Sequence, residues 1–175
     1  RSTNNGNNWT AVNSELTNTR VGGFAVLGSY LFAGTFGGGV FRSTNNGANW
    51  TASSSGITHT SATNLIVSGT NIFAGSGGSG VFRSTNNGTN WTPVNSGLTA
   101  LGIWSMGYDI SGNLLSGSEA GVFRSTNNGL NWVNINTGII KILNRTFAVS
   151  GSNIFAGTGG GGVFLSSNSG GSWIP

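Results

Sequence analysis

The chain has no cysteine among its 175 residues, and only 6% of its residues are charged. The lack of cysteine excludes a disulfide framework, a thiolate metal site and a cysteine nucleophile. No apolar run approaches the roughly 20 residues that a membrane-spanning helix needs, so we expect no membrane insertion. Ordinary soluble domains have about 25% charged residues. Asn, Ser and Thr must therefore supply most of the polarity that faces solvent.

Acidic residues are the scarcest charged groups, and their scarcity explains the net charge of +4. A nucleic-acid-binding protein gathers its cations in a patch, whereas four arginines here recur at one even spacing. This spacing favours structural arginines that pack on neighbouring units over a ring of phosphate-binding groups. We expect no nucleic-acid partner. The evenly spaced residues are Arg1, Arg42, Arg83 and Arg124.

Cofactor and metal motifs are weak. His59 is the only histidine, and a lone imidazole with scattered acids does not make a transition-metal site. The glycine-rich runs at 75–80 and 157–162 fit the dinucleotide fingerprint G-x-G-x-x-G, but that fingerprint has meaning only between a strand and a helix. Both runs precede a Val-Phe strand instead. We expect neither a metal nor a cofactor.

One nine-residue sequence occurs five times, and this repetition predicts the architecture. The copies begin at residues 1, 42, 83, 124 and 165, which gives a strict period of 41 residues. Such a period is typical of arrays in which each unit packs only on its neighbours. The repeats are 1–41, 42–82, 83–123 and 124–164, followed by the partial repeat 165–175.

Each repeat contains four short runs of β-branched and aromatic residues, separated by Gly, Asn and Ser. In the second repeat these runs predict strand A at 64–69, strand B at 71–76, strand C at 80–85 and strand D at 90–95. Helical periodicity is missing throughout. The pattern predicts an all-β β-propeller with four-stranded antiparallel blades of 41 residues, four blades to a chain.

The repeated nonapeptide joins strand C to strand D and has the pattern S-x-N-x-G-x-x-W. Its Ser and Asn side chains can accept hydrogen bonds from backbone N–H groups of their own turn, its Gly permits a positive φ, and its Trp covers the hairpin. The residues with this structural role are Ser2, Asn4, Gly6, Trp9, Ser43, Asn45, Gly47, Trp50, Ser84, Asn86, Gly88, Trp91, Ser125, Asn127, Gly129, Trp132, Ser166, Asn168, Gly170 and Trp173.

The nonapeptide resembles the Asp-box, or BNR repeat, of sialidase-like β-propellers, which also occurs in sortilin-type receptors, xyloglucanases and photosystem II assembly factors. The resemblance covers the whole chain and implies a propeller in which this turn is a folding device, away from any active site. Every copy departs from the family at one position, because Asn replaces the Asp. The substitution removes the charge and keeps the acceptor oxygen.

Sialidase activity is not implied. The family's catalytic set needs an arginine triad, a tyrosine–glutamate nucleophile pair and a further acid, but this chain has only Glu15, Asp109 and Glu119 as acids. Glycoside hydrolysis requires two carboxyl groups that face each other across the scissile bond. Glu119 and Asp109 lie at opposite ends of one predicted hairpin, and Glu15 falls on another blade. We therefore expect no enzymatic activity.

The segments that join strand D to the next strand A differ between repeats and contain most of the side chains that could recognise a ligand. In propellers these D–A segments share one face with the B–C loops. Variable loops on a constant frame indicate either recognition or unconstrained drift. Trp104 is the only tryptophan outside the nonapeptide, and near an arginine it would suit stacking on a sugar or an aromatic group. The candidate ligand-binding residues are Trp104, Arg20, His59, Lys141, Arg145 and Glu119.

The two ends leave the assembly open. Residues 9–14 supply a strand D that could complete the blade begun by residues 142–165. One chain would then close four blades, two chains exchanging end strands would close eight, or the segment belongs to a longer array. We favour a symmetric homodimer, because small glycine-rich blades suit a gentle rotation between neighbours.

The sequence thus predicts a non-catalytic binding or structural module. A lectin-like, carbohydrate-binding propeller is the alternative, and a glycoside hydrolase is a more distant third. The expected partners are a second copy of the chain and a glycan or protein ligand. We expect an extracellular or cell-surface protein of bacterial origin.

Overall fold

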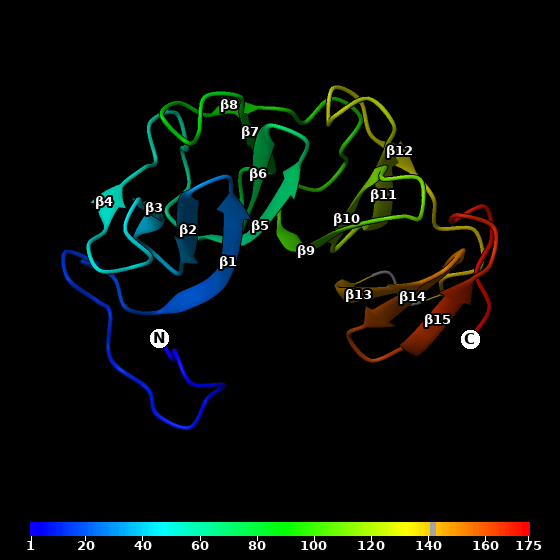
Figure 1. Ribbon diagram of the computed structural model, residues 1–175. Coiled ribbons are helices and arrows are strands. Elements are labelled where there is room, and N and C mark those ends of the chain that lie inside the picture. Colours follow the sequence, from blue (N-terminus) through cyan, green and yellow to red (C-terminus); the bar gives the residue numbers. More distant parts are fainter. Residues whose placement is uncertain (141–142) are drawn as a thin grey trace.

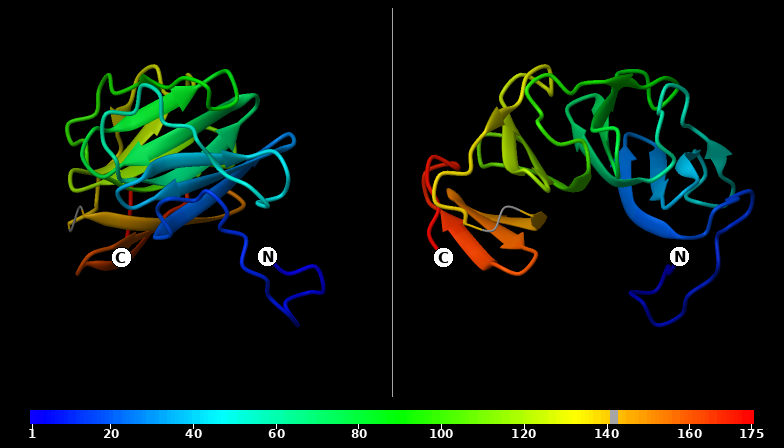
Figure 2. Two further views of the ribbon diagram at one scale, coloured as in Figure 1. Left: turned by 90° about the vertical axis from the view of Figure 1, so that its left-hand side faces the viewer. Right: turned by 180° about the vertical axis from the view of Figure 1, so that it is seen from behind.

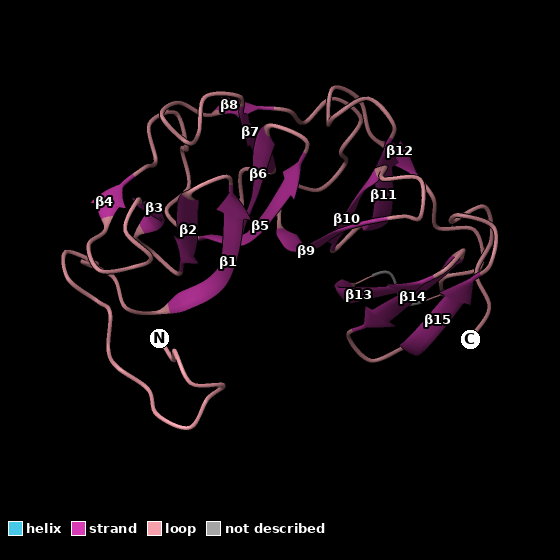
Figure 3. Ribbon diagram, in the orientation of Figure 1, coloured by secondary structure: helices cyan, strands magenta, loops and turns pink. Residues whose placement is uncertain are grey.

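The computed structural model describes residues 1–140 and 143–175, and every regular element within them is a β-strand (Figures 1 and 3). The strands form four antiparallel sheets in which the order of the strands follows the chain. Each sheet is one blade, as the repeat predicts, and the all-β fold class is confirmed. None of the described residues forms a helix of the length and apolar character that crossing a membrane requires.

The strands fall into four consecutive sets. Blade one contains β1 (Val21–Leu27), β2 (Tyr30–Thr35), β3 (Gly39–Ser43) and β4 (Thr51–Ala52), and blade two contains β5 (Ala62–Ser68), β6 (Asn71–Ser76), β7 (Val81–Ser84) and β8 (Thr92–Pro93). Blade three contains β9 (Ile103–Tyr108), β10 (Leu114–Ser118), β11 (Gly121–Ser125) and β12 (Val133–Asn134), and blade four contains β13 (Asn144–Ser150), β14 (Asn153–Thr158) and β15 (Gly162–Ser166).

In the second repeat, strand B has its predicted bounds and strand C is shorter by one residue at each end, whereas strands A and D differ more. In the second repeat, strand A begins at Ala62 rather than at residue 64. Strand D shrinks from the predicted 90–95 to the two residues of β8. After β8, Val94 still donates its N–H to the Val81 carbonyl group of strand C at 2.9 Å. The chain then turns toward the following blade, where the Ser96 carbonyl group accepts from the Trp132 N–H at 2.8 Å.

The four blades follow one another along an arc, and the two ends of the chain lie on its opposite limbs (Figures 1 and 2). The A strands β1, β5, β9 and β13 lie along the inner side of the arc and pack against one another in this order. The short D strands β4, β8 and β12 lie on the outer side (Figure 1). The A strands therefore line the surface that a closed propeller would turn toward its axis.

The core lies between the blades rather than within one of them. Phe32, Phe73, Phe82, Phe123 and Phe164 are all fully buried, and each core cluster combines side chains of neighbouring repeats. A single flat sheet has two apolar faces and cannot cover either one alone. Each blade therefore depends on its neighbours for most of its hydrophobic stabilisation.

The nonapeptide turn has the internal hydrogen bonds that the sequence predicts. The Ser43 Oγ accepts from the Gly47 N–H at 2.9 Å, and the Asn45 Oδ1 accepts from the Asn49 N–H at 2.9 Å. Gly47 has a φ of 83°, and the preceding Asn46 also lies in the left-handed region at 55°. Asn and Gly tolerate this region best. The uncharged Asn thus keeps the full set of backbone bonds of this turn.

The tryptophan of the turn also joins neighbouring blades, a role that the sequence did not reveal. The Trp91 Nε1 donates to the Ser53 carbonyl group of the preceding blade at 2.7 Å. Three other indoles make the same bond to a carbonyl group 38 residues earlier in the sequence, namely those of Trp50, Trp132 and Trp173. These four indoles are each 3% exposed. Trp9 differs: it is 75% exposed.

The repeated arginines join the blades in the opposite direction. The Arg42 Nη1 donates to the Asn87 carbonyl group in the turn of the following blade at 2.7 Å, and Arg124 bonds to Ser169 in the same way at 2.6 Å. Arg1 and Arg83 make the equivalent bonds. The acceptors are the turn residues with positive φ. The interpretation of these arginines as links to neighbouring blades is therefore confirmed.

The N-terminal segment does not complete blade four within this chain, contrary to one of the predicted closures. Residues 9–14 form no strand. The outer edge of β15 instead makes a bridge to Ile174 from its own repeat, with two backbone bonds of 2.8 and 2.9 Å between Leu165 and Ile174. The arc is open, and blade four supplies its own outer residue.

Replacing Ser84 by alanine should destabilise the fold by about 1–3 kcal/mol, because the buried N–H group of Gly88 would lose its acceptor. The free energy of unfolding from urea titration measures the effect. Ser2→Ala is the matched control, since Ser2 makes the same bonds in the exposed N-terminal copy. An equal loss of unfolding free energy in both variants would contradict the prediction that burial of the turn makes the lost hydrogen bond costly.

Tyr108 provides a second test of contacts between blades. Burial raises its pKa to about 12, and its hydroxyl donates to the Val67 carbonyl group of blade two. The unfolded chain ionises near pH 10, whereas the folded chain keeps the proton, so stability should fall as the pH rises from about 10 to 12. Tyr108→Phe should remove this loss in pH-dependent denaturation, and Tyr30→Phe should not.

Candidate functional site

A groove of about 430 Å³ lies on the inner side of the arc, where the A strands begin. Segments from all four blades form it. Its lining combines the starts of strands A with the B–C loops, which is the face that the sequence predicts for recognition. The lining residues are Gly22, Phe36, His59, Ser61, Thr63, Asn64, Gly77, Ile103, Trp104 and Arg145.

Each blade contributes one large side chain to this groove. Phe36 follows β2 in blade one, His59 precedes β5 in blade two, Trp104 lies in β9 of blade three, and Arg145 lies in β13 of blade four. Trp104 and Arg145 were predicted in loops but lie in strands. Because they occupy the same repeat position 41 residues apart, adjacent blades bring them side by side.

The Trp104 and Arg145 side chains stack. The guanidinium carbon of Arg145 lies 4.8 Å from the centre of the Trp104 ring. Trp104 is 40% exposed, and Arg145 is also exposed. A cation over an indole face is stabilised by the ring quadrupole. The pair therefore presents an aromatic surface beside a fixed positive charge.

His59 is oriented by its own backbone. Its Nδ1 accepts from the Ser61 N–H at 3.1 Å, so the neutral imidazole carries its proton on Nε2. The ring packs close to the B–C loop of the same blade, where a Cβ built on Gly78 would lie 3.1 Å from Nε2. Glycine at this point lets the imidazole lie against the loop. His59 can thus offer an Nε2–H donor near the groove.

Arg20 extends the same surface through Phe36. Its guanidinium carbon lies 4.4 Å from the centre of the Phe36 ring. The backbone holds the two residues together, since the Phe36 N–H donates to the Arg20 carbonyl group at 2.9 Å. Asn18 adds a bond of 3.0 Å from its Nδ2 to the Phe36 carbonyl group. The groove region therefore has two cation–aromatic pairs.

The structure thus unites His59, Trp104 and Arg145 in the groove and places Arg20 at its border. Glu119 is different: it is exposed in the B–C turn of blade three, against the backbone of Gly102, and does not line the groove. Lys141 lies outside the described residues.

Arg145 gives the groove a positive charge, and no acidic residue is among the lining residues. Asp109 is buried in the turn after β9, where its carboxylate accepts from the Ser111 N–H, the Asn113 N–H and the Asn113 Nδ2 at 2.8–2.9 Å. Glu15 is exposed in the N-terminal segment with a φ of 65°. Among the residues the structure describes, no three acidic or histidine side chains gather to hold a metal ion.

Sequence reasoning missed Phe36. The B–C loops of blades two and four have glycine, Gly77 and Gly159, where blade one has Phe36. Aligning these loops by the repeat would have shown one large apolar residue among glycines. The same alignment would have shown that Thr63, Trp104 and Arg145 share one position, which predicts their contact.

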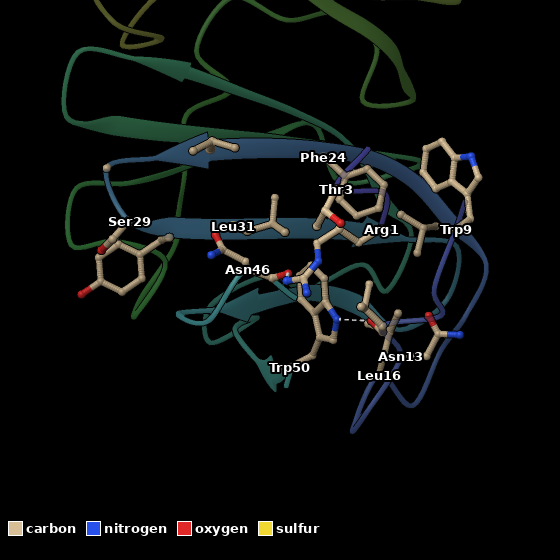
Figure 4. Close-up of a pocket in the computed structure, with 15 residues that line it drawn as sticks. Arg1, Thr3, Trp9, Asn13, Leu16, Phe24, Ser29, Leu31, Asn46 and Trp50 are labelled. Atoms are coloured by element: carbon tan, nitrogen blue, oxygen red, sulfur yellow. Dashed lines mark hydrogen bonds between the residues drawn. The ribbon is translucent and has the colours of Figure 1, made fainter. Parts of the chain in front are cut away.

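A second, larger and more apolar cavity of about 720 Å³ lies at the open face of blade one. Figure 4 shows Phe24, Leu31 and Trp50 around it, with Thr3 and Trp9 of the N-terminal segment nearby. Its apolar lining comes from positions that neighbouring blades cover elsewhere in the array. The counterparts of Phe24 and Leu31 in blade two are Leu65 and Ile72, which are 7% and 0% exposed.

No family model matches the chain, and no curated protein matches it. Solved structures match along most of its length. An ancestral GH74 enzyme is 24% identical with a TM-score of 0.74, over 92% of this chain and 26% of its own. The GH74 xyloglucanase from Xanthomonas campestris is 18% identical with a TM-score of 0.67, over 90% of this chain and 30% of its own.

A third structure, YCF48 bound to D1 peptide, is 20% identical with a TM-score of 0.65 and is covered over 58% of its length by 98% of this chain. The fold is that of a β-propeller. At these identities the likeness shows nothing finer than the fold. The chain spans less than two thirds of each of these three structures. Other similar structures include extracellular domains of proteins from B. thetaiotaomicron.

Proposed function

We propose that this β-propeller segment is a non-catalytic binding module whose ligand occupies the groove of Phe36, His59, Trp104 and Arg145. The convergence of these four side chains from four different blades supports the proposal. Core packing does not require it, since Trp104 and Phe36 are each 40% exposed. An exposed aromatic surface beside polar groups is typical of a binding site.

The chemistry of the groove favours a carbohydrate that bears a carboxylate. The apolar C–H face of a sugar ring can stack on the exposed part of Trp104. The guanidinium group of Arg145 is placed to pair with a carboxylate at the edge of that sugar, and the groove has no lining acid to compete. The xyloglucanase among the similar structures is named for a carbohydrate.

A carboxylate-bearing peptide is the second candidate. The same cation–aromatic pair would accept an aromatic side chain next to an acid. One of the similar structures has a peptide bound, as its description states. The two candidates are distinguished by which array, one of acidic glycans or one of acidic peptides, gives a signal that Trp104→Ala removes.

A hydrolytic function is disfavoured by the positions of the three acids. Asp109 uses its carboxylate within a turn, and Glu15 and Glu119 lie outside the groove on different parts of the arc. Two facing carboxyl groups, which glycoside hydrolysis needs, do not occur among the groove residues. Alanine at these three positions should leave any hydrolytic activity of the preparation unchanged.

We also propose that the repeated turn is an Asn-bearing form of the Asp-box. Its support is that the Ser and Asn side chains each accept a hydrogen bond from a backbone N–H group of the turn in all five copies. An extracellular or cell-surface location is part of the same proposal. It is supported by the extracellular bacterial domains among the similar structures.

Trp104→Ala should reduce binding to an array of acidic glycans by about tenfold or more, because it removes the stacking surface. Arg145→Gln should reduce binding to acidic glycans and leave neutral ones unaffected. Trp9→Ala is the matched control, since Trp9 is an exposed tryptophan that does not line the groove. If Trp104→Ala and Trp9→Ala bind alike, the groove is not the binding site.

A further inference from the structure

The groove is built around a row of residues at one repeat position, and this row begins with a glycine in blade one. The members of the row in blades one to four are Gly22, Thr63, Trp104 and Arg145. A Cβ built on Gly22 would lie 3.0 Å from the Phe36 Cε2 and 2.6 Å from the Thr63 Cβ. The Phe36 ring therefore takes the space that a side chain at residue 22 would fill, and it lies beside Thr63.

The groups along this row have the same order from either end: a cation, an aromatic ring, a small residue, an aromatic ring and a cation. Arg20 stacks on Phe36 with its guanidinium carbon 4.4 Å from the ring centre. Arg145 stacks on Trp104 at 4.8 Å. Because β5 packs between β1 and β9, its residue Thr63 separates the two aromatic rings.

Both aromatic rings present a free face to solvent. Phe36 and Trp104 are each 40% exposed, and the two arginines that stack on them are exposed as well. Stacking orders each guanidinium group before a ligand arrives, which lowers the entropy lost on binding. Among the described residues that line the groove, none is acidic. The row therefore offers two ordered cation–aromatic pairs to an anionic ligand.

The middle of the groove offers hydrogen bonds. Thr63 and His59, both of blade two, line this part. The His59 Nδ1 accepts from the Ser61 N–H at 3.1 Å, which leaves the Nε2–H group as a donor. A ligand group at this point can therefore be recognised by hydrogen bonds, whereas the groups on either side of it stack on the aromatic rings.

We propose that the groove binds a linear polymer of uronic acid, and that three consecutive units of the polymer occupy it. This inference rests on the proposed function of the groove and names the form of the ligand. One unit stacks on Phe36 and another on Trp104, with their carboxylates paired to Arg20 and Arg145. The unit between them passes over Thr63. One monosaccharide cannot stack on both rings, because the inner strand of blade two separates them.

The aromatic rings favour a uronic acid polymer over an acidic peptide of the same charge. A pyranose unit has a rigid apolar C–H face that can stack on an aromatic ring, and a glutamate side chain has none. Once one unit is bound, the second stacking contact forms within the same complex, so it adds affinity without a second association step. The affinity should therefore rise steeply with chain length until both rings are covered.

The length requirement is tested by calorimetric titration of the full chain with mono-, di-, tri- and pentasaccharides of galacturonic acid. The trisaccharide should bind at least about tenfold more tightly than the disaccharide, and further lengthening should add little. The neutral trisaccharide maltotriose and the peptide pentaglutamate should each bind at least about tenfold more weakly than the trisaccharide of galacturonic acid. Equal affinity for the mono- and trisaccharides, or for pentaglutamate and the pentasaccharide, would overturn the proposal.

Substitutions at the first cation–aromatic pair test whether it holds the third unit. Phe36→Ala and Arg20→Gln should each weaken binding of the trisaccharide by about tenfold, because each removes one contact of the unit at blade one. Both should leave binding of the monosaccharide unchanged, since a single unit binds to the larger ring of Trp104. The matched controls are Phe24→Ala and Arg1→Gln, which alter an exposed phenylalanine and an exposed arginine that do not line the groove.

Phe36→Leu guards against a general disturbance of the loop. Leucine keeps an apolar contact with Thr63 but has no ring face, so this variant should lose as much affinity for the trisaccharide as Phe36→Ala does. If all three variants bind like the controls while Trp104→Ala still weakens binding, the groove is a binding site but the polymer proposal is wrong. If Trp104→Ala also has no effect, the proposed function of the groove fails as well.

Discussion

Four indole Nε1–H groups each donate to a carbonyl group 38 residues earlier, and this is the contact on which the rest of the structure depends: Trp50, Trp91, Trp132 and Trp173. A blade of this chain has a D strand of only two paired residues, too short to protect an edge by itself. The tryptophan of the next blade bonds to the residues that continue this strand, as Trp91 of blade two does to Ser53 after β4 of blade one. It also brings the nonapeptide turn over the phenylalanines of the preceding blade, as the contact between Gly88 and Phe32 shows. Hydrogen bonding and apolar packing between blades thus depend on one side chain.

Because the links between blades lie away from the inner side of the arc, that side is free for recognition. The turns, the tryptophans and the repeated arginines hold the blades from the outer side, and none of them lines the inner groove. Substitutions at the starts of the A strands therefore change the groove without changing the links. Gly22, Thr63, Trp104 and Arg145 share one repeat position and differ completely in chemistry. The position is not equally free in every blade, because a Cβ built on Gly22 would lie 2.6 Å from the Thr63 Cβ of the next blade.

The sequence predicted the fold well because its period is strict and its turn chemistry is local. Ser43, Asn45 and Gly47 bond within one turn, so their roles follow from spacing alone. The even spacing of the arginines also predicted their packing on neighbouring units. The bond from Trp50 joins two repeats and could not be predicted from a single turn. The groove was predicted in part: Trp104, His59 and Arg145 were identified as candidates, but their contact depends on the packing of neighbouring blades. Phe36 was missed because it lies in a glycine-rich loop.

The direction of the two kinds of link has a consequence for how such a chain can change its length. The indole reaches a carbonyl group 38 residues earlier, and the guanidinium group reaches one 45 residues later. A residue inserted within a strand would displace both donors from their acceptors, whereas a residue inserted in an exposed loop can leave them in place. Growth of the array without loss of these links therefore requires whole repeats. Duplication of complete 41-residue units is the route by which arrays of this kind can grow while every junction stays intact.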